Sequence, residues 1–344
     1  MSMKKSSIFY LLPVTLLFIS FSGCNKASDS SSDLVGNWIA SSDFDGNARS
    51  EAVSFTIGAK TYLSTGTTST TRFNDLWEYD NNLKYWTQKA SLPANARSSA
   101  VAFVVNGKGY IGTGYDGSNQ LNDFWEYDPA TNKWTQKANF AGTARYDAVA
   151  FSMNNKGYVC SGFDGNYLKD LWEFTPGATE SDPGSWTQRA SLGGTKRSAA
   201  MAFVLNGKAY IVSGNNNGTA LNDLWAYDAA ADTWTQKRKI SNVSDDTYDD
   251  NYSSIARFNG VAFIMGTKAY ITTGENGSIV STTWEYDDVN DQWTQRTAFE
   301  GSARTGAAAF TLGDRGFVLT GRNGSLSYDN MYEFHPLETE NSND

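Results

Sequence analysis

The stretch "LNDFWEYDPATNKWTQKA", residues 121–138, decides the fold because the chain repeats it. Close variants begin at Phe73 ("FNDLWEYDNNLKYWTQKA"), at Leu221 ("LNDLWAYDAAADTWTQK") and at Thr282 ("TTWEYDDVNDQWTQR"). An internal repeat of this length predicts that each copy is one supersecondary unit, which buries its apolar faces against its neighbours. The period of the repeat therefore determines the architecture.

The tryptophans of the "WTQ" phrase, with Trp38 of "NWIA" added in front, set that period. Their spacings are 48, 48, 52, 48 and 59 residues, for Trp38, Trp86, Trp134, Trp186, Trp234 and Trp293. An arginine follows each tryptophan by eleven positions, except that an insertion delays the fifth; the six are Arg49, Arg97, Arg145, Arg197, Arg257 and Arg304. The chain therefore holds six units of similar length.

Each unit contains the signals of four short strands. A run of small and apolar residues such as "AVAF" at Ala100 starts three positions after the arginine. The "NGK" at Asn106 suits a type I′ hairpin turn, because Asn and Gly accept positive φ angles. A second strand ending in Gly, a third strand ("LWEYD") and the tryptophan strand complete the unit. An aromatic content of 14% fits such an all-β chain.

These units resemble kelch repeats in four features: the arginine before the first strand, the final glycine of the second, the Tyr-Asp of the third, and the tryptophan. The resemblance covers residues 38 to about 335 and implies an all-β, six-bladed β-propeller of four-stranded blades. The second strands end in Thr-Gly or Ser-Gly where the family usually has Gly-Gly. No tryptophan strand follows "NMYEFHP", so we expect the strand around Trp38 to complete the last blade and close the ring.

The N-terminus reads as a targeting segment. Lys4 and Lys5 precede an apolar run at residues 8–20, which is too short to span a bilayer. The "FSGC" that ends at Cys24 resembles a bacterial lipobox, and Asn25 then favours the outer membrane; an ordinary secretory signal is the alternative. We expect a signal peptide (1–23), a Ser-rich tether (24–36), the propeller (37–337) and a disordered tail (338–344).

Composition excludes several function classes. Loss of residues 1–23 would leave 26 basic against 37 acidic residues, and such an acidic protein repels nucleic acid. Cys160 would be the one cysteine besides Cys24, which allows no internal disulfide. The single histidine, His335, argues against Ser-His-Asp or Cys-His catalysis, a catalytic zinc, and the copper centre of galactose oxidase, the kelch-type oxidase. We expect no metal or other cofactor, with one exception given below.

Two features are candidate binding elements. In a propeller the loops that precede the first strand and the loops between second and third strands share one face, so the six arginines should surround its central depression. The resemblance implies that ligands bind there, and guanidinium groups suit carboxylates. Alternatively, each arginine pairs with carbonyl or carboxylate groups inside its own blade. The repeated glutamate of "WEYD" is interpreted as such a structural group.

The second element is the longest break in the repeat, residues 239–256, on the same face. Its acidic and aromatic side chains could bind a sugar or a calcium ion at 245–250, or simply form a solvated loop; they are Asp245, Asp246, Tyr248, Asp249, Asp250 and Tyr252.

We therefore expect a non-enzymatic, monomeric, lipid-anchored propeller of the bacterial envelope that binds a glycan or an envelope protein, with no contact to the membrane beyond its anchor. One alternative is an enzyme acting on acidic sugars, similar to the kelch-type sialic acid mutarotases, with Arg holding a carboxylate and Glu or Asp as acid-base group. Another is a structural or adhesion component. Fold alone does not choose among them.

Overall fold

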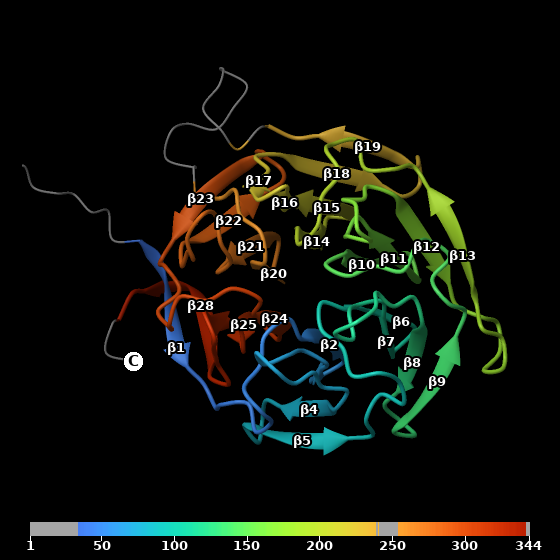
Figure 1. The fold of residues 1–344 in the computed structure, drawn as a ribbon. Helices are drawn as coiled ribbons and strands as arrows, with labels where there is room; N and C mark the ends of the chain where they lie inside the picture. Colours follow the sequence, from blue (N-terminus) through green and yellow to red (C-terminus); the bar gives the residue numbers. More distant parts are fainter. Residues whose placement is uncertain (1–33, 239, 241–253, 342–344) are drawn as a thin grey trace, which may run out of the picture. The chain divides into compact units, whose positions relative to one another are not determined.

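The computed structural model describes residues 34–238, 240 and 254–341, and in this part of the chain every regular element is a strand. Six four-stranded antiparallel sheets surround a central axis, and two short hairpins lie in loops (Figure 1). This confirms the six-bladed propeller. No helix in the described ranges is long and apolar enough to cross a membrane. The expected signal peptide, Cys24 and the acidic segment 241–253 lie outside the described residues.

Each blade runs outward from an inner strand at the axis (Figure 1). The first three blades are β2 (Val53–Ile57), β3 (Lys60–Ser64), β4 (Leu76–Asp80), β5 (Tyr85–Lys89); β6 (Val101–Val105), β7 (Lys108–Gly112), β8 (Phe124–Asp128), β9 (Lys133–Lys137); β10 (Val149–Met153), β11 (Lys156–Cys160), β12 (Leu171–Thr175), β13 (Ser185–Arg189). The last three are β14 (Met201–Leu205), β15 (Lys208–Val212), β18 (Leu224–Asp228), β19 (Thr233–Gln236); β20 (Val261–Met265), β21 (Lys268–Thr272), β22 (Thr283–Asp287), β23 (Gln292–Arg296); β24 (Ala308–Leu312), β25 (Arg315–Leu319), β28 (Met331–Thr339), β1 (Val35–Ala40). The hairpins are β16 (Asn215–Asn216) with β17 (Thr219–Ala220), and β26 (Arg322–Asn323) with β27 (Leu326–Ser327).

The ring closes as predicted, because β1 pairs with β28 as the outer strand of blade 6. Trp38 lies opposite Phe334, and its indole packs on the Phe299 ring of blade 5 at 5.0 Å between centroids. The domain boundaries need correction, however. β1 begins at Val35 and β28 continues to Thr339, because the two ends pair across a register shift.

Local sequence explains the hairpins within each blade. Asn106 and Gly107 join β6 to β7 with φ angles of 51° and 71°, which the Asn-Gly pair adopts readily. Val101 and Phe103 alternate with less buried residues along β6, the pattern of a strand with one face in the core. Gly109 on β7 is required by packing, since a Cβ there would lie 2.2 Å from the Phe55 ring of the preceding blade.

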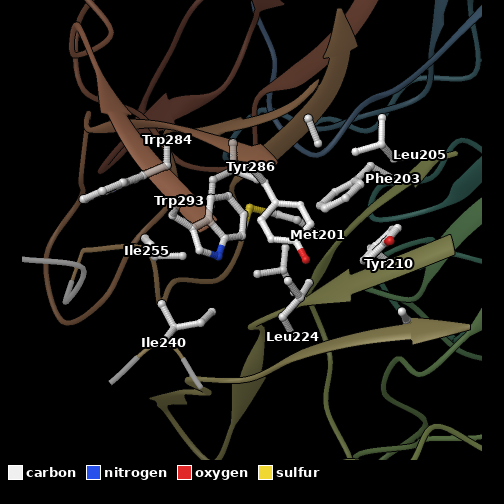
Figure 2. Close-up of a cluster of buried hydrophobic side chains, with 14 residues drawn as sticks. Met201, Phe203, Leu205, Tyr210, Leu224, Ile240, Ile255, Trp284, Tyr286 and Trp293 are labelled. Atoms are coloured by element: carbon white, nitrogen blue, oxygen red, sulfur yellow. The ribbon is translucent and has the colours of Figure 1, made fainter. Parts of the chain in front are cut away.

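Aromatic side chains from the repeated phrase fill the space between blades. Figure 2 shows one such seam, where Trp293 and Tyr286 of blade 5 meet Phe203 and Leu224 of blade 4. The Phe203 and Tyr286 rings are 6.0 Å apart. Burying one such ring contributes up to about 4–6 kcal/mol at about 25 cal/mol/Å². The phrase therefore holds the blades together, as its repetition suggested.

Hydrogen bonds reinforce several seams. The indole of Trp134 in blade 2 donates to the Ala90 carbonyl of blade 1 at 2.7 Å. Trp186 and Trp234 repeat the contact one and two blades further on. Blade 6 uses Trp38, which donates to the Thr297 carbonyl of blade 5 at 3.2 Å. The scaffold thus presents its loops on a rigid frame.

Candidate functional site

The six repeated arginines are fully buried, with 0% of their surface exposed. In blades 1–4 each guanidinium forms a bidentate ion pair with the aspartate that directly precedes the third strand. Arg97 is typical: Nη1 and Nη2 donate to the two Asp123 oxygens at 2.7 and 2.8 Å, and Nη1 also reaches the Thr113 carbonyl at 3.0 Å. The corresponding pairs are Arg49–Asp75, Arg145–Asp170 and Arg197–Asp223.

Arg257 and Arg304, in blades 5 and 6, have no such aspartate, because Thr282 and Asn330 replace it. Arg257 donates to Thr282 Oγ1 at 2.7 Å, and Arg304 lies 4.5 Å from the Tyr328 ring centroid. Burial lowers the pKa of Arg257 to about 9 and that of Arg304 to about 10, so both remain charged at neutral pH. Within the described residues, Arg304 Nη2 and Asn330 Oδ1 are buried without a hydrogen bond.

The expectation that these arginines present themselves to a ligand therefore needs correction. They precede the inner strands of the six blades but are buried, and most of their donors are occupied by carbonyl, carboxylate or hydroxyl groups of their own blade. The repeated glutamates are structural too, with partners other than the six repeated arginines. Tyr110 Oη donates to Glu126 Oε2 at 2.5 Å, and Tyr158 and Arg189 both contact Glu173, whose pKa falls to about 2 against the effect of burial.

Two other residues singled out in the sequence lie in structural settings. Cys160 is fully buried, which raises the pKa of its thiol to about 12 and leaves it protonated and unreactive. His335 is on β28, where Nε2 lies 2.8 Å from Glu333 and Nδ1 lies 2.9 Å from Glu338. Neither residue lines the central depression on the face that carries the arginine loops, which we call the loop face.

The central depression of the loop face is lined by the residues two and three positions after each arginine, around a cavity of about 150 Å³. The residues two positions after form a closed ring of six backbone hydrogen bonds, in which each N–H donates to the carbonyl one blade back at 2.7 to 3.1 Å. All six have φ between 51° and 63°; they are Glu51, Ser99, Asp147, Ala199, Asn259 and Gly306. We call them the axial ring.

The side chains of the axial ring differ from blade to blade because the backbone alone makes the bonds. Its acidic groups gather on one side: Glu51 accepts a hydrogen bond from Ser99 Oγ at 3.1 Å, and Asp147 follows in the next blade. Burial raises the pKa of Asp147 to about 7, and the charge of Glu51 adds to the effect despite opposing contributions from Ser99 and Arg322. No group of three or more potential metal ligands occurs among the described residues.

A row of half-buried aromatic rings crosses the loop face over blades 2 and 3. Neighbouring centroids are 5.5 Å apart for Tyr115 and Tyr146, 5.6 Å for Tyr146 and Phe163, and 5.1 Å for Phe163 and Tyr167. The positions equivalent to Tyr115 and Phe163 hold Thr67, Asn215, Glu275 and Arg322 in the other blades. The aromatic row is therefore a local departure from the repeat, which joins the loops of blades 2 and 3 through Tyr115 and Tyr146 and lies outside the core cluster between these blades.

A cavity lies near each end of the aromatic row. One, of about 450 Å³, is lined by Phe163, Tyr167, Lys196 and two asparagines of the β16–β17 hairpin. The other, of about 430 Å³, lies between the β3–β4 loop of blade 1 and the β26–β27 hairpin of blade 6. Arg72 borders this second cavity, and its guanidinium lies 4.9 Å from the Tyr115 centroid.

Sequence reasoning missed the axial ring, the aromatic row and Arg72 because it followed what repeats. The signal that could have found them is variation between the repeats. At aligned loop positions the residue changes from blade to blade, while the strand sequences stay alike. The acidic segment with Asp245, Asp246, Tyr248, Asp249, Asp250 and Tyr252 lies outside the described residues, apart from the end of the insertion at Ser254 to Ala256. Calcium binding at 245–250 thus stays a prediction.

Comparisons with known proteins agree with the fold. The KLHDC2/KLHL20/DRC7 Kelch-repeats domain model matches residues 142–321, and the Kelch motif model matches residues 96–141. A solved structure titled "Structure of YjhT" superposes with a TM-score of 0.70 over 84% of this chain and 95% of that one, at 15% identity. At that identity the likeness shows the fold alone. No curated protein sequence matches the chain.

Proposed function

Since the chain belongs to the kelch-repeat family, we propose that it is a non-enzymatic binding propeller that holds a glycan on the aromatic row of its loop face. The observation that carries the proposal is the row itself. Four aromatic rings within 5.1 to 5.6 Å of their neighbours form a half-exposed surface outside the core cluster between blades 2 and 3. Sugar rings present apolar C–H faces that pack on such rings, while their hydroxyl groups need polar partners nearby.

Polar partners are present at both ends of the row. Lys196, Asn216 and Asn217 line the cavity beside Tyr167, and serine and threonine hydroxyls line the cavity beside Arg72. The row with its two cavities thus offers stacking in the middle and hydrogen bonding at the ends, which suits an oligosaccharide better than a single sugar.

The proposed location is the bacterial outer membrane, with the propeller tethered through a lipid on Cys24. The basic start, the apolar run and the "FSGC" motif support this part of the proposal. A net charge of −9 for the whole chain fits a partner other than nucleic acid or an anionic membrane surface.

A glycan array probed with the protein from residue 25 onward tests the proposed function. We expect binding that falls at least about tenfold, or about 1.4 kcal/mol, in Tyr146→Ala, since the central ring of the row is lost. Tyr85→Ala is the matched control, because Tyr85 is a 47% exposed aromatic on the outer strand β5. A blank array with folded protein would contradict the glycan and favour an envelope protein, and equal binding by both variants would contradict the site.

The second candidate function is an enzyme that acts on acidic sugars. It is supported by the acidic residues of the axial ring. Asp147 has its pKa raised to about 7, where a carboxyl group can both give and take a proton at neutral pH. Exchange between the anomers of a sialic acid, followed by NMR, tests this. Acceleration by wild type but not by Asp147→Asn would support the enzyme; rates equal to buffer alone would leave the binding function.

A further inference from the structure

We propose that the cavity between blades 6 and 1 binds an oxyanion group of the ligand, a carboxylate or a sulfate or phosphate ester, and that Arg72 is the residue that recognises it. This rests on the proposed function, since the oxyanion would belong to a glycan whose rings lie on the aromatic row. It adds a charge requirement that the row alone does not impose.

Arg72 differs from the six repeated arginines in both position and pairing. It stands at a site where the other blades have Gln120, Tyr167, Ala220, Ile279 and Ser327. No carboxylate of the described residues lies within ion-pair distance of its guanidinium, and its Nε is buried without an acceptor. A buried guanidinium N–H without an acceptor is costly, and a bound oxyanion would supply one.

The neighbours of Arg72 hold its guanidinium in place. One face lies 4.9 Å from the Tyr115 ring centroid, a favourable cation–π distance. Gly117 leaves room on another side, since a Cβ there would lie 2.7 Å from Arg72 Nη1. A guanidinium fixed in this way loses little side-chain freedom when it binds a planar oxyanion through two parallel hydrogen bonds.

The remaining lining of the cavity fits an anionic, hydroxyl-rich ligand. Arg322 is the second cation, and Glu51, the one acid of the lining, lies 3.6 Å from it. Two arginines and one glutamate leave a net charge of about +1, although the chain as a whole is acidic. Hydroxyl groups complete the wall, from Ser50, Thr67, Thr68, Ser69, Ser325 and Ser327. The volume of about 430 Å³ falls in the range of small-ligand sites.

The test compares four probes of similar size by calorimetry or by NMR titration: glucose, glucuronate, glucose 6-sulfate and glucose 6-phosphate. We expect at least one charged probe to bind about tenfold or more tightly than glucose, and its identity distinguishes a carboxylate from the two esters. Arg72→Gln should abolish the preference, while Arg72→Lys, which keeps the charge but not the fork, should keep part of it. Lys133→Gln, at an exposed lysine on β9, is the charge control and should change nothing.

Two outcomes would overturn the oxyanion site: no charged probe binds more tightly than glucose, or the preference survives in Arg72→Gln. Both variants are compared at a melting temperature equal to that of wild type. If Arg72→Lys folds but prefers charged probes no more than Arg72→Gln does, the preference depends on the two parallel N–H groups of the guanidinium and not on its charge alone. Failure here is distinguishable from failure of the proposed function. Neutral glycans that bind wild type but not Tyr146→Ala would keep the binding propeller while removing its anionic subsite.

Discussion

Blades 1–4 and blades 5–6 differ in how they accommodate the buried charge of the repeated arginine. In the first four, a buried arginine is neutralised by a half-buried aspartate that directly precedes the third strand, as in Arg97–Asp123. In the last two, the arginine remains but the aspartate is replaced, and Arg304 relies on the Phe299 and Tyr328 rings and on carbonyl groups. The arginine thus persists without its ion pair.

This difference separates two roles of the arginine. Its hydrogen bonds to the carbonyl at the end of the second strand occur in all six blades, for example to Thr113 and to Thr320. They fix the start of the inner strand against the end of the second. The carboxylate balances the charge and also accepts a hydrogen bond from the tryptophan of the third strand, as Asp123 does from Trp125, and blades 5 and 6 lack it.

Removing β1 should have the largest effect, because blade 6 lacks the ion pair and depends on its outer strand. Deletion of residues 34–42 exposes the long edge of β28 and removes the fully buried Trp38. We expect loss of the soluble monomer, measured by size-exclusion chromatography and thermal melting. A chain shortened only up to residue 33 is the control. A stable, monomeric deletion variant would show that five complete blades suffice.

Breaking an ion pair in the regular blades should come next. Asp123→Asn leaves Arg97 buried with an uncompensated charge, which we expect to cost about 3–5 kcal/mol of the free energy of unfolding. Urea denaturation measures it, with Asp314→Asn at a 95% exposed side chain as the control. A loss below about 1 kcal/mol would mean that the arginine is satisfied by its carbonyl partners alone in every blade.

Building the missing pair should give a smaller change of opposite sign. Asn330→Asp places a carboxylate beside Arg304, whose Nη2 has no hydrogen bond among the described residues. We expect a gain of about 1–2 kcal/mol from the charge-assisted hydrogen bonds, seen as a higher melting temperature. Asn82→Asp, at an exposed turn, is the matched control. No gain, or a loss, would indicate that the aromatic rings around Arg304 already neutralise it as well as an aspartate does.

Asp147 is the converse case, a carboxylate without an arginine partner, and its effect should appear only when the pH is changed. Its folded-state pKa of about 7 exceeds the ordinary value of 3.8, so the folded state holds the proton longer than the unfolded one. Wild type should therefore lose stability relative to Asp147→Asn as pH rises from about 4 to about 7, with no further change above. Melting temperatures at pH 4, 6 and 8 test this; a constant difference between the two proteins would place the pKa of Asp147 at its ordinary value.

The sequence predicts the scaffold well because the scaffold is repetitive. The tryptophan spacing, the Asn-Gly turn at Asn106 and the unpaired strand around Trp38 each specify local structure or closure directly. Pairing of the arginines with carbonyl or carboxylate groups of their own blade was one of two alternatives, but the aspartates were not identified. Asp75 and Asp123 lie 26 residues from Arg49 and Arg97, and only the register of the third strand brings them there. Arg72 and the aromatic row were not predicted either, since they occur once and depend on which loops become neighbours around the axis.

The axial ring has a consequence for how the molecule can change over generations. Because the backbone makes these hydrogen bonds, each position can hold any side chain that tolerates a positive φ. Substitutions can therefore change the lining of the depression without breaking the ring, as Glu51, Ser99 and Ala199 illustrate. Each blade contributes one N–H and one carbonyl to the ring, so every blade is joined to both of its neighbours at the axis. The ring is thus kept by the backbone alone while the side chains that line the depression vary.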